Sequence, residues 1–172
     1  MLSKIFIGAD HRGYNFKKKI INLLERSRYQ VVDMGTYAAE PPCDYPKISY
    51  DVAQKVASAK NSRGILICMT GIGHTIAANK VPGAYAALCY SKSAAILSRR
   101  HNNANILVLG AKFVSPKKMP GIIKAWLNEK FEGGRHLRRV RQIREIEMEV
   151  CHAKSKGQKS KVISKKFNTS DF

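Results

Sequence analysis

The strongest constraint on the fold is an alternation of short apolar runs and amphipathic segments, which occurs five times along the chain. Each apolar run has the length of a buried strand, and apolar residues recur at helical spacing in each segment that follows. This alternation predicts an α/β fold, in which a five-stranded parallel sheet carries helices on both faces. The expected strands cover residues 4–9, 29–34, 65–68, 84–89 and 105–110.

The central repeat, residues 63–80, is the one most typical of a functional site. An apolar strand ending at Cys68 leads into a turn with Gly71 and Gly73, and a helix begins near Thr75. This arrangement directs several backbone N–H groups, and the positive end of a helix dipole, toward one point, which suits a phosphate or an oxyanion. A thiolate is stabilised there too, so Cys68 is a candidate base or nucleophile. The ordinary alternative for Cys68 is a small residue of the core.

Length and composition are those of an ordinary globular protein. The 172 residues suit a single domain, with 44% apolar and 25% charged residues. No apolar run approaches the roughly 18 residues of a membrane span, and no signal segment precedes the first strand, so we expect a cytoplasmic protein. The four cysteines lack the spacing of a metal site and are expected to be reduced thiols.

The net charge of +19 is unusually high. Residues 151–172 carry six lysines and one aspartate without an apolar period, so we expect a disordered basic tail after a domain that spans residues 1–150. A basic surface attracts polyanions of any kind. Because no aromatic platform or nucleic-acid motif accompanies the charge, we favour a solvated surface suited to anionic substrates over one that binds nucleic acid.

Polar and reactive residues follow the expected strands at their carboxyl ends, where parallel sheets bind ligands. Asp10 and His11 come directly after the first strand, Tyr45 ends the loop after the second, and Cys68 ends the third. The last helix, from about His136 to about Val150, has no obvious place on a five-stranded sandwich. We therefore expect it to reach toward a second subunit.

Seven short motifs stand in a characteristic order between residues 8 and 140. They read Gly8-Ala-Asp-His-Arg-Gly-Tyr14, Asp44-Tyr-Pro46, Gly64-Ile-Leu-Ile-Cys-Met-Thr-Gly-Ile-Gly73, Ile76-Ala-Ala-Asn-Lys-Val-Pro-Gly83, Ala86-Ala-Leu-Cys89, Arg100-His-Asn-Asn-Ala-Asn105 and Phe131-Glu-Gly-Gly-Arg-His-Leu-Arg-Arg-Val140. In this order they resemble the ribose-5-phosphate isomerase type B family, a sugar-phosphate isomerase family that also contains the galactose-6-phosphate isomerase subunits. The resemblance covers residues 4 to about 143.

The resemblance implies a Rossmann-like three-layer sandwich with an extra C-terminal helix. It implies a homodimer or a dimer of dimers, with active sites at the subunit interface. The implied reaction interconverts D-ribose 5-phosphate and D-ribulose 5-phosphate through an enediolate, in the non-oxidative branch of the pentose phosphate pathway, without metal or organic cofactor. The C2 proton, which the C1 carbonyl acidifies, is removed and returned at C1.

The same resemblance implies four catalytic residues. Cys68 would be the base that moves the proton between C2 and C1, and Thr70 would assist proton movement or ring opening. His101 would open the sugar ring, with Asp10 handling the other proton. The structural alternatives are ordinary ones, since a histidine suits the last turn of a helix and an aspartate suits a helix cap.

Ten further residues would bind the substrate, again by resemblance. The enediolate oxygen would be held by the side chain of Asn102 and by the backbone N–H groups of Gly71, Ile72, Gly73 and His74. Tyr45 would line the sugar pocket. The phosphate would be bound by His11, Lys112, Arg135 and Arg139, although the two arginines could also belong to a solvated basic face. We expect all these residues at the same edge of the sheet.

Five positions depart from the usual residues of the family, and at two of them, Ser91 and Asn103, an aspartate is replaced. Met69 stands in place of a glycine next to the candidate base, and Lys112 in place of a frequent arginine. His74 stands where most members with a cysteine base have methionine, and where another branch has a glutamate base. It is either a second titratable group or, as we favour, only a polar start to the helix. These departures concern substrate preference and rate more than reaction type.

Two alternative functions remain open from the sequence. The first is isomerisation of a hexose 6-phosphate such as allose or galactose 6-phosphate, because the sequence does not measure the distance between phosphate anchor and base. The second is a catalytically weak member of the family that binds polyanions through its basic surface and tail.

Overall fold

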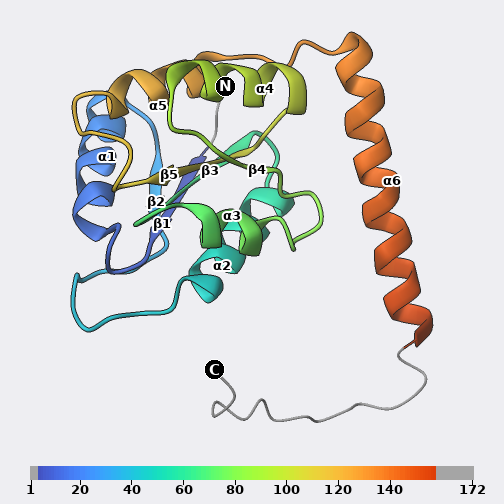
Figure 1. Cartoon of the computed structure of the whole chain (residues 1–172), viewed down its shortest axis with the longest axis horizontal. Coiled ribbons are helices and arrows are strands. Elements are labelled where there is room, and N and C mark those ends of the chain that lie inside the picture. The colour runs from blue at the N-terminus through green and yellow to red at the C-terminus, as the bar shows by residue number, and fades with distance from the viewer. Residues whose placement is uncertain (1–3, 158–172) are drawn as a thin grey trace.

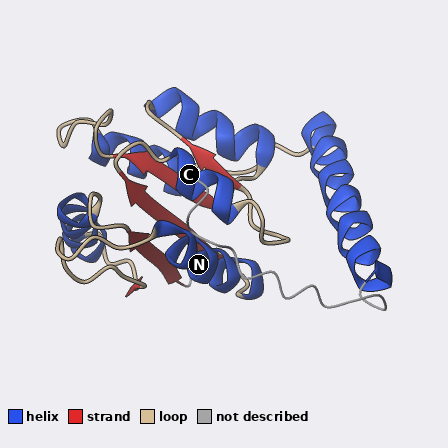
Figure 2. Cartoon of the chain, turned by 60° about the horizontal axis from the view of Figure 1, so that its bottom comes forward, coloured by secondary structure: helices blue, strands red, loops and turns tan. Residues whose placement is uncertain are grey.

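The structure is a computed structural model that describes residues 4–157, and it confirms the expected five-stranded parallel sheet between two layers of helices (Figures 1 and 2). The strands are β1 (Lys4–Ala9), β2 (Val31–Asp33), β3 (Ser62–Cys68), β4 (Ala86–Leu88) and β5 (Ile106–Gly110). The helices are α1 (Tyr14–Arg26), α2 (Tyr45–Ser58), α3 (Ile72–Ala78), α4 (Lys92–Asn102), α5 (Met119–Asn128) and α6 (Gly134–Gly157). The fold is therefore Rossmann-like, as expected.

Both faces of the sheet are buried, which explains why its central strands are apolar without interruption. Along β3, Ile65 and Ile67 point into one core and Leu66 into the other, because side chains alternate between the faces of a strand. The first core is closed by α1, α4 and α5, with Trp126 of α5 fully buried in it. The second core is closed by α2 and α3, through residues such as Val52.

The strand order β2-β1-β3-β5-β4 places a topological switch point between β1 and β3. The chain passes from β1 to β2 on one side and later continues to β3 on the other. In parallel sheets of this kind, the connections diverge at such a point and leave a crevice at the carboxyl ends of the strands. Asp10 follows β1 and Cys68 ends β3, so both border this crevice.

Some element boundaries differ from those expected. β2 and β4 have three residues each, fewer than predicted, and both are edge strands with a hydrogen-bonded neighbour on one side only. Helix α6 continues to Gly157, so residues 151–157, which we expected to begin a disordered tail, are helical. The rest of the expected tail, residues 158–172, lies outside the described residues.

Lys17 is the first of three consecutive lysines in α1, a residue type that is usually exposed. The side chain of Lys17 is instead fully buried, and its ammonium group donates to Asp33 and to the carbonyl of Thr36, the latter at 2.6 Å. The four methylene groups of lysine reach past the end of β2 to these partners. The buried charge is therefore paired and hydrogen-bonded, as a buried charge must be.

Helix α6 lies beside the sandwich and does not cover either face of the sheet (Figures 1 and 2). Its 24 residues correspond to a length of about 36 Å. A carboxylate oxygen of Glu147 accepts hydrogen bonds from the Gly83 N–H at 3.3 Å and the Tyr85 hydroxyl at 3.1 Å, which tie the helix to the segment before β4. Five of its apolar side chains are exposed, namely Leu137, Ile143, Ile146, Met148 and Val150.

Within residues 4–157, none of the helices has both the length and the apolar character that crossing a bilayer would require.

Candidate active site

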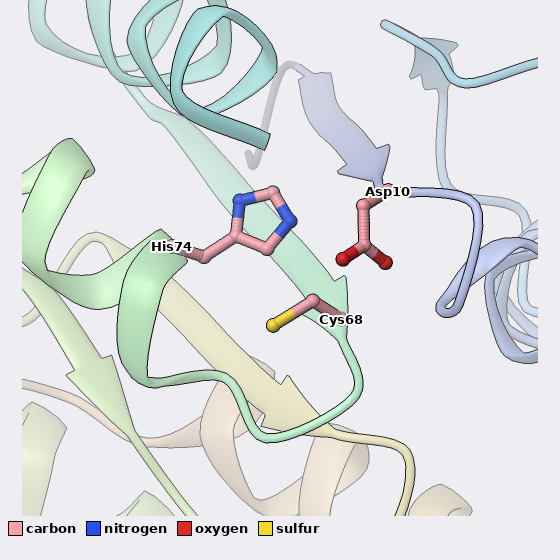
Figure 3. A group of neighbouring side chains, drawn as sticks. All are labelled: Asp10, Cys68 and His74. Carbon is pink, nitrogen blue, oxygen red and sulfur yellow. The ribbon is translucent and has the colours of Figure 1, made fainter. Parts of the chain in front are cut away.

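Three reactive side chains meet in the crevice between β1 and β3 (Figure 3). Asp10 follows β1, Cys68 is the last residue of β3, and His74 lies in the first turn of α3. One ligand-type atom from each of the three lies within 4.8 Å of those of the other two. All three residues are buried, at 7%, 6% and 0% exposure respectively, so the sheet edge predicted from the sequence does gather a buried reactive cluster.

The sulfur of Cys68 is held by the turn that follows β3. The backbone N–H of Gly71 donates to Sγ at 3.0 Å. Gly71 has φ of 87°, and a Cβ atom built on it would lie 2.3 Å from Cδ1 of Leu88. The turn therefore requires glycine both for its backbone conformation and for space.

Asp10 fixes the loop that follows β1. Its Oδ1 accepts the Gly13 N–H at 2.8 Å, which closes the turn before α1. The N-cap of α1 is Gly13, without a side-chain cap, so Asp10 is not the capping residue considered from the sequence. Burial raises the pKa of the Asp10 carboxyl, and the hydrogen bond from Gly13 acts in the opposite direction. A carboxyl with a raised pKa can carry or release a proton near neutral pH more readily than an exposed aspartate.

His74 is fully buried, and its proton positions follow from its neighbours. The hydroxyl of Ser49 lies 2.6 Å from Nδ1 and also donates to the Tyr45 carbonyl at 2.9 Å. Because a serine hydroxyl has one proton, both bonds form together only if Nδ1 is the protonated nitrogen and Nε2 carries a lone pair. Burial also lowers the pKa of His74 to about 4, so the ring is neutral at pH 7.

Tyr45 closes the side of this cluster. Its ring meets that of His74 edge to face at a centroid distance of 5.6 Å, and a Cβ atom on Gly73 would lie 2.5 Å from its Cζ. Gly73 thus allows the tyrosine to lie against the start of α3. The side chain of Tyr45 is 38% exposed, so it forms part of the wall between the buried cluster and solvent, where we expected a residue lining the sugar pocket.

The backbone donors proposed for an oxyanion are at the start of α3, and two of the four already have partners. The N–H of Gly71 bonds to Cys68, and the N–H of Ile72 bonds to the Thr70 hydroxyl oxygen at 3.3 Å. The first bond of the helical ladder runs from Thr75 N–H to the Gly71 carbonyl. The N–H groups of residues 73 and 74 precede it and are the donors that a helix leaves for a ligand.

Two of the expected phosphate ligands lie at the same edge of the sheet. His11 is held beside the loop after β2, with Nδ1 accepting the Cys43 N–H at 3.2 Å. Lys112 follows β5, is exposed, and donates its backbone N–H to the Met69 carbonyl at 3.0 Å. Met69 is itself 38% exposed, so its side chain does not fill the buried cluster.

The remaining expected site residues lie at the opposite edge, which corrects the expectation of a single site edge. Helix α4 begins after β4 at the carboxyl edge and ends at the amino edge, carrying His101 and Asn102 with it. The Asn105 carbonyl accepts the Gly64 N–H near the start of β3, which fixes this end of α4 there. The seven residues of β3 separate the two edges by about 20 Å.

The group at the amino edge is compact. The rings of His101 and His136 stack in parallel at a centroid distance of 4.1 Å, and both Nε2 atoms face a carboxylate oxygen of Glu132 at 3.8 and 4.0 Å. Arg135 donates to Nε2 of His136 at 3.4 Å. Burial, and then the positive charges of His101 and Arg135, lower the pKa of His136. Arg135 and Arg139 are exposed on α6, a concentration of positive charge that suits an anion.

Two residues of these groups were missed by the sequence analysis. Ser49 orients His74, but nothing in the pattern of α2 distinguishes it from other small residues on the buried face. His136 lies in the motif that contains Arg135, and its position next to a proposed phosphate ligand was the available signal.

The sequence is similar to known isomerases along most of its length. Residues 5–143 match the family model described as Ribose/Galactose Isomerase. The chain is 42% identical over 146 residues to the ribose-5-phosphate isomerase B of Escherichia coli K12, which covers 85% of this chain and 97% of that protein.

Solved structures give the same result. The ribose-5-phosphate isomerase B of Clostridium thermocellum is 48% identical with a TM-score of 0.83, over 86% of this chain and 99% of that one. The enzyme of Mycoplasma genitalium with bound ribulose-5-phosphate is 43% identical with a TM-score of 0.82, over 85% of this chain and 97% of that one. A family model over most of the chain, and relatives at this identity, place the protein in one family. The chain belongs to the ribose/galactose isomerase family.

Proposed function

We propose that this chain is a cytoplasmic ribose-5-phosphate isomerase that uses Cys68 as its base. The observation that carries the proposal is the buried sulfur at the end of β3, which accepts the Gly71 N–H at 3.0 Å in the crevice of the sheet. Relatives named ribose-5-phosphate isomerase B, one of them with bound ribulose-5-phosphate, support the substrate. The four cysteines form no disulfide, which suits a reducing compartment.

In the proposed reaction, Cys68 moves one proton from C2 to C1 of the sugar. The thiolate of Cys68 removes the C2 proton of the open-chain aldose. The electrons of that C–H bond form the C1=C2 double bond, and the carbonyl electrons move to the C1 oxygen to give an enediolate. The proton of the C2 hydroxyl passes to the C1 oxygen, the thiol returns its proton to C1, and the C2 oxygen becomes the ketone. A positioned base of this kind contributes about 10²–10⁴-fold to the rate.

The negative charge of the enediolate needs donors that are in place before the reaction. The N–H groups of Gly73 and His74 in the first turn of α3 supply them, since those of Gly71 and Ile72 bond to Cys68 and Thr70. A donor of this type contributes roughly 3 kcal/mol to transition-state stabilisation in comparable sites. Asp10, with its raised pKa, is suited to exchange a proton with a sugar hydroxyl during ring opening.

The distance between the two edges of the sheet bears on the oligomeric state. Cys68 and Asp10 lie at the carboxyl edge, whereas His101 and Arg135 lie at the amino edge, about 20 Å away along β3. A pentose phosphate is far too short to reach both groups within one chain. We infer that each active site combines the carboxyl edge of one subunit with the amino edge of a second subunit.

Helix α6 supports this arrangement. It projects beside the sandwich, and its exposed apolar residues Ile143, Ile146 and Val150 recur at intervals of three and four positions, with Leu137 six positions before them. Such a stripe is expected to be buried against another surface. Because Arg135 and Arg139 occupy the same helix, a partner that covers the stripe would also receive the two arginines.

Turnover of phosphosugars by the purified chain tests the proposal. We expect conversion of ribose 5-phosphate with a kcat/KM at least about tenfold higher than for allose 6-phosphate or galactose 6-phosphate, because one additional carbon displaces either the phosphate or the reacting carbons. A preference for a six-carbon substrate would support the proposed reaction type but contradict ribose 5-phosphate as the substrate. Absence of turnover with all three sugars would reject the proposal.

A further inference from the structure

The buried cluster in the crevice offers three different ligand atoms to one point. A thiol sulfur from Cys68, an imidazole nitrogen from His74 and a carboxylate oxygen from Asp10 lie within 4.8 Å of one another. They come from the end of β3, the first turn of α3 and the end of β1. Figure 3 shows the His74 ring and the Asp10 carboxylate facing each other, with Cys68 below them and its sulfur on the side away from Asp10. The isomerase reaction as proposed above uses the sulfur and the carboxyl but gives no role to the imidazole.

The imidazole of His74 is the independent indication of a ligand. Its Nε2 is buried and makes no hydrogen bond of ordinary geometry within residues 4–157, and a backbone interaction of the ring with Ile67 only partly offsets the effect of burial on its pKa. A buried polar atom without a good partner is costly. Figure 3 shows this nitrogen on the side of the ring that faces Asp10. The other nitrogen, Nδ1, is held at 2.6 Å by the Ser49 hydroxyl.

This arrangement of the histidine is the one that metal-binding histidines adopt. A ligating imidazole presents a lone pair to the metal and donates its other N–H to a fixed oxygen, which sets the tautomer and the ring orientation. When Oγ of Ser49 donates to the Tyr45 carbonyl, it accepts from Nδ1 and thereby leaves the lone pair on Nε2, with Oγ of Ser49 as the fixed oxygen. The second layer of such a site is therefore already in place.

The ligand types select the class of ion. A thiolate, an imidazole and a carboxylate suit Zn²⁺ and similar borderline ions such as Co²⁺, whereas Mg²⁺ and Ca²⁺ prefer oxygen ligands alone. At usual zinc–ligand lengths, tetrahedral geometry places ligand atoms about 3.3–3.7 Å apart, so side-chain rotations of roughly 1 Å would close the present cluster around an ion. The charges of the thiolate and the carboxylate together neutralise a divalent cation.

We propose that Asp10, Cys68 and His74 form a binding site for Zn²⁺, and that the bound ion inhibits the enzyme by occupying the sulfur of its base. The inhibition rests on the proposed function, but the binding of the ion does not. Binding replaces the S–H bond of Cys68 with a Zn–S bond and releases the thiol proton to solvent. The fourth position of the ion is left for water or for a substrate oxygen.

The binding test uses the full chain, reduced, freed of metal with a chelator, and titrated with Zn²⁺ in competition with a chromophoric chelator. We expect one tightly bound ion per chain and no binding of Mg²⁺. Cys68→Ser and His74→Met should each weaken Zn²⁺ binding by about 100-fold or more. Ser49→Ala, which keeps all three ligands, should weaken it by about 10–100-fold through loss of the support to His74. Unchanged affinity in Cys68→Ser would overturn the proposal.

A second cluster, His101, Glu132 and His136, also brings three ligand-type atoms together, so the site of binding must be distinguished. His136→Ala should leave the tight Zn²⁺ site intact. Co²⁺ provides a spectroscopic test, because only a thiolate ligand gives a sulfur-to-cobalt charge-transfer band in the near ultraviolet. We expect the band in the parent chain and its loss in Cys68→Ser. The control variant Cys151→Ser, which removes the exposed thiol, should retain the band. A band that survives in Cys68→Ser, or binding that is lost in His136→Ala, would contradict the assignment.

Turnover of ribose 5-phosphate separates this proposal from the proposed function. If both hold, one equivalent of Zn²⁺ abolishes turnover, a chelator restores it, and saturating substrate slows the inhibition. Zinc binding without turnover of any phosphosugar would support the metal site and reject the isomerase. Turnover that a bound equivalent of Zn²⁺ leaves unchanged would reject inhibition at Cys68 and leave the isomerase standing.

Discussion

The backbone N–H of Gly71 lies 3.0 Å from the sulfur of Cys68, in a turn whose backbone only glycine adopts without strain. The φ angle of Gly71 is 87°, and the nearest atom to a Cβ built there is Cδ1 of Leu88 at 2.3 Å. The position of the candidate base therefore depends on a residue that has no side chain.

Gly71→Ala is expected to move the turn away from Leu88 and to misplace the sulfur. We predict a loss of about 2 kcal/mol or more in unfolding free energy and a fall in turnover of about tenfold or more. The matched control is Gly121→Ala in α5, where a Cβ meets nothing within 4 Å and the backbone is helical. Gly121→Ala should raise the unfolding free energy by about 0.5–1 kcal/mol, as measured by urea denaturation. Equal effects at the two glycines would contradict the account of the turn.

Burial of His74 makes stability depend on pH. Its pKa is about 4 in the folded chain against an ordinary 6.5, so the unfolded chain binds the proton more readily between these values. The contribution of neutral His74 to the unfolding free energy is therefore fully present above pH 6.5. It is lost as the pH decreases toward 4, by about 3 kcal/mol in total. We expect this loss in the chelator-treated parent chain and its absence in His74→Met, with both followed by urea denaturation at several pH values. Parallel curves for the two proteins would show that His74 is not buried as a neutral ring.

The buried ammonium of Lys17 depends on its carboxylate partner. Asp33→Ala leaves the charge of a fully buried lysine without its counter-ion, which should cost about 3 kcal/mol or more of unfolding free energy. Asp51→Ala breaks the exposed pair with Lys47 and should cost less than about 1 kcal/mol. Thermal and urea unfolding of the two variants provide the comparison. Similar losses would mean that Lys17 is not buried as described.

A site shared between subunits predicts complementation. Cys68→Ala and the double variant Arg135→Ala with Arg139→Ala should each be nearly inactive alone. When the two are unfolded together and refolded, half of the dimers are mixed, and one of the two sites in each mixed dimer has both intact edges. We expect recovery of about a quarter of the parent turnover. No recovery, with mixed dimers demonstrated by mass spectrometry, would place each site within one chain.

The sequence predicts the sheet and the carboxyl-edge cluster well because both depend on local order along the chain. An apolar run that ends at Cys68, followed by a glycine turn and a helix, has few alternative structures, and the structure confirms them. The contacts between distant segments are less predictable. Neither the burial of Lys17 against Asp33 nor the bond between Ser49 and His74 leaves a periodic signal in the sequence.

The edge assigned to His101 was wrong for a different reason. A helix that follows a parallel strand returns across the sheet, so the end of α4 had to lie at the amino edge, away from Cys68. The alternation of strands and helices was sufficient to predict that the end of α4 lies at the amino edge, but the order of the motifs suggested a single cluster of site residues. The roles of the individual site residues stay predictions, since the structure fixes only their positions.

Turnover of ribose 5-phosphate by the parent chain, Cys68→Ala and Cys151→Ala tests the central claim most directly. The parent chain and Cys151→Ala, which removes only an exposed thiol on α6, should convert the aldose to ribulose 5-phosphate at equal rates. Cys68→Ala should fold with the same circular dichroism spectrum and lose about 10²-fold or more in kcat. Parent-like turnover by a folded Cys68→Ala would contradict the assignment of the base and direct attention to His74 and Asp10.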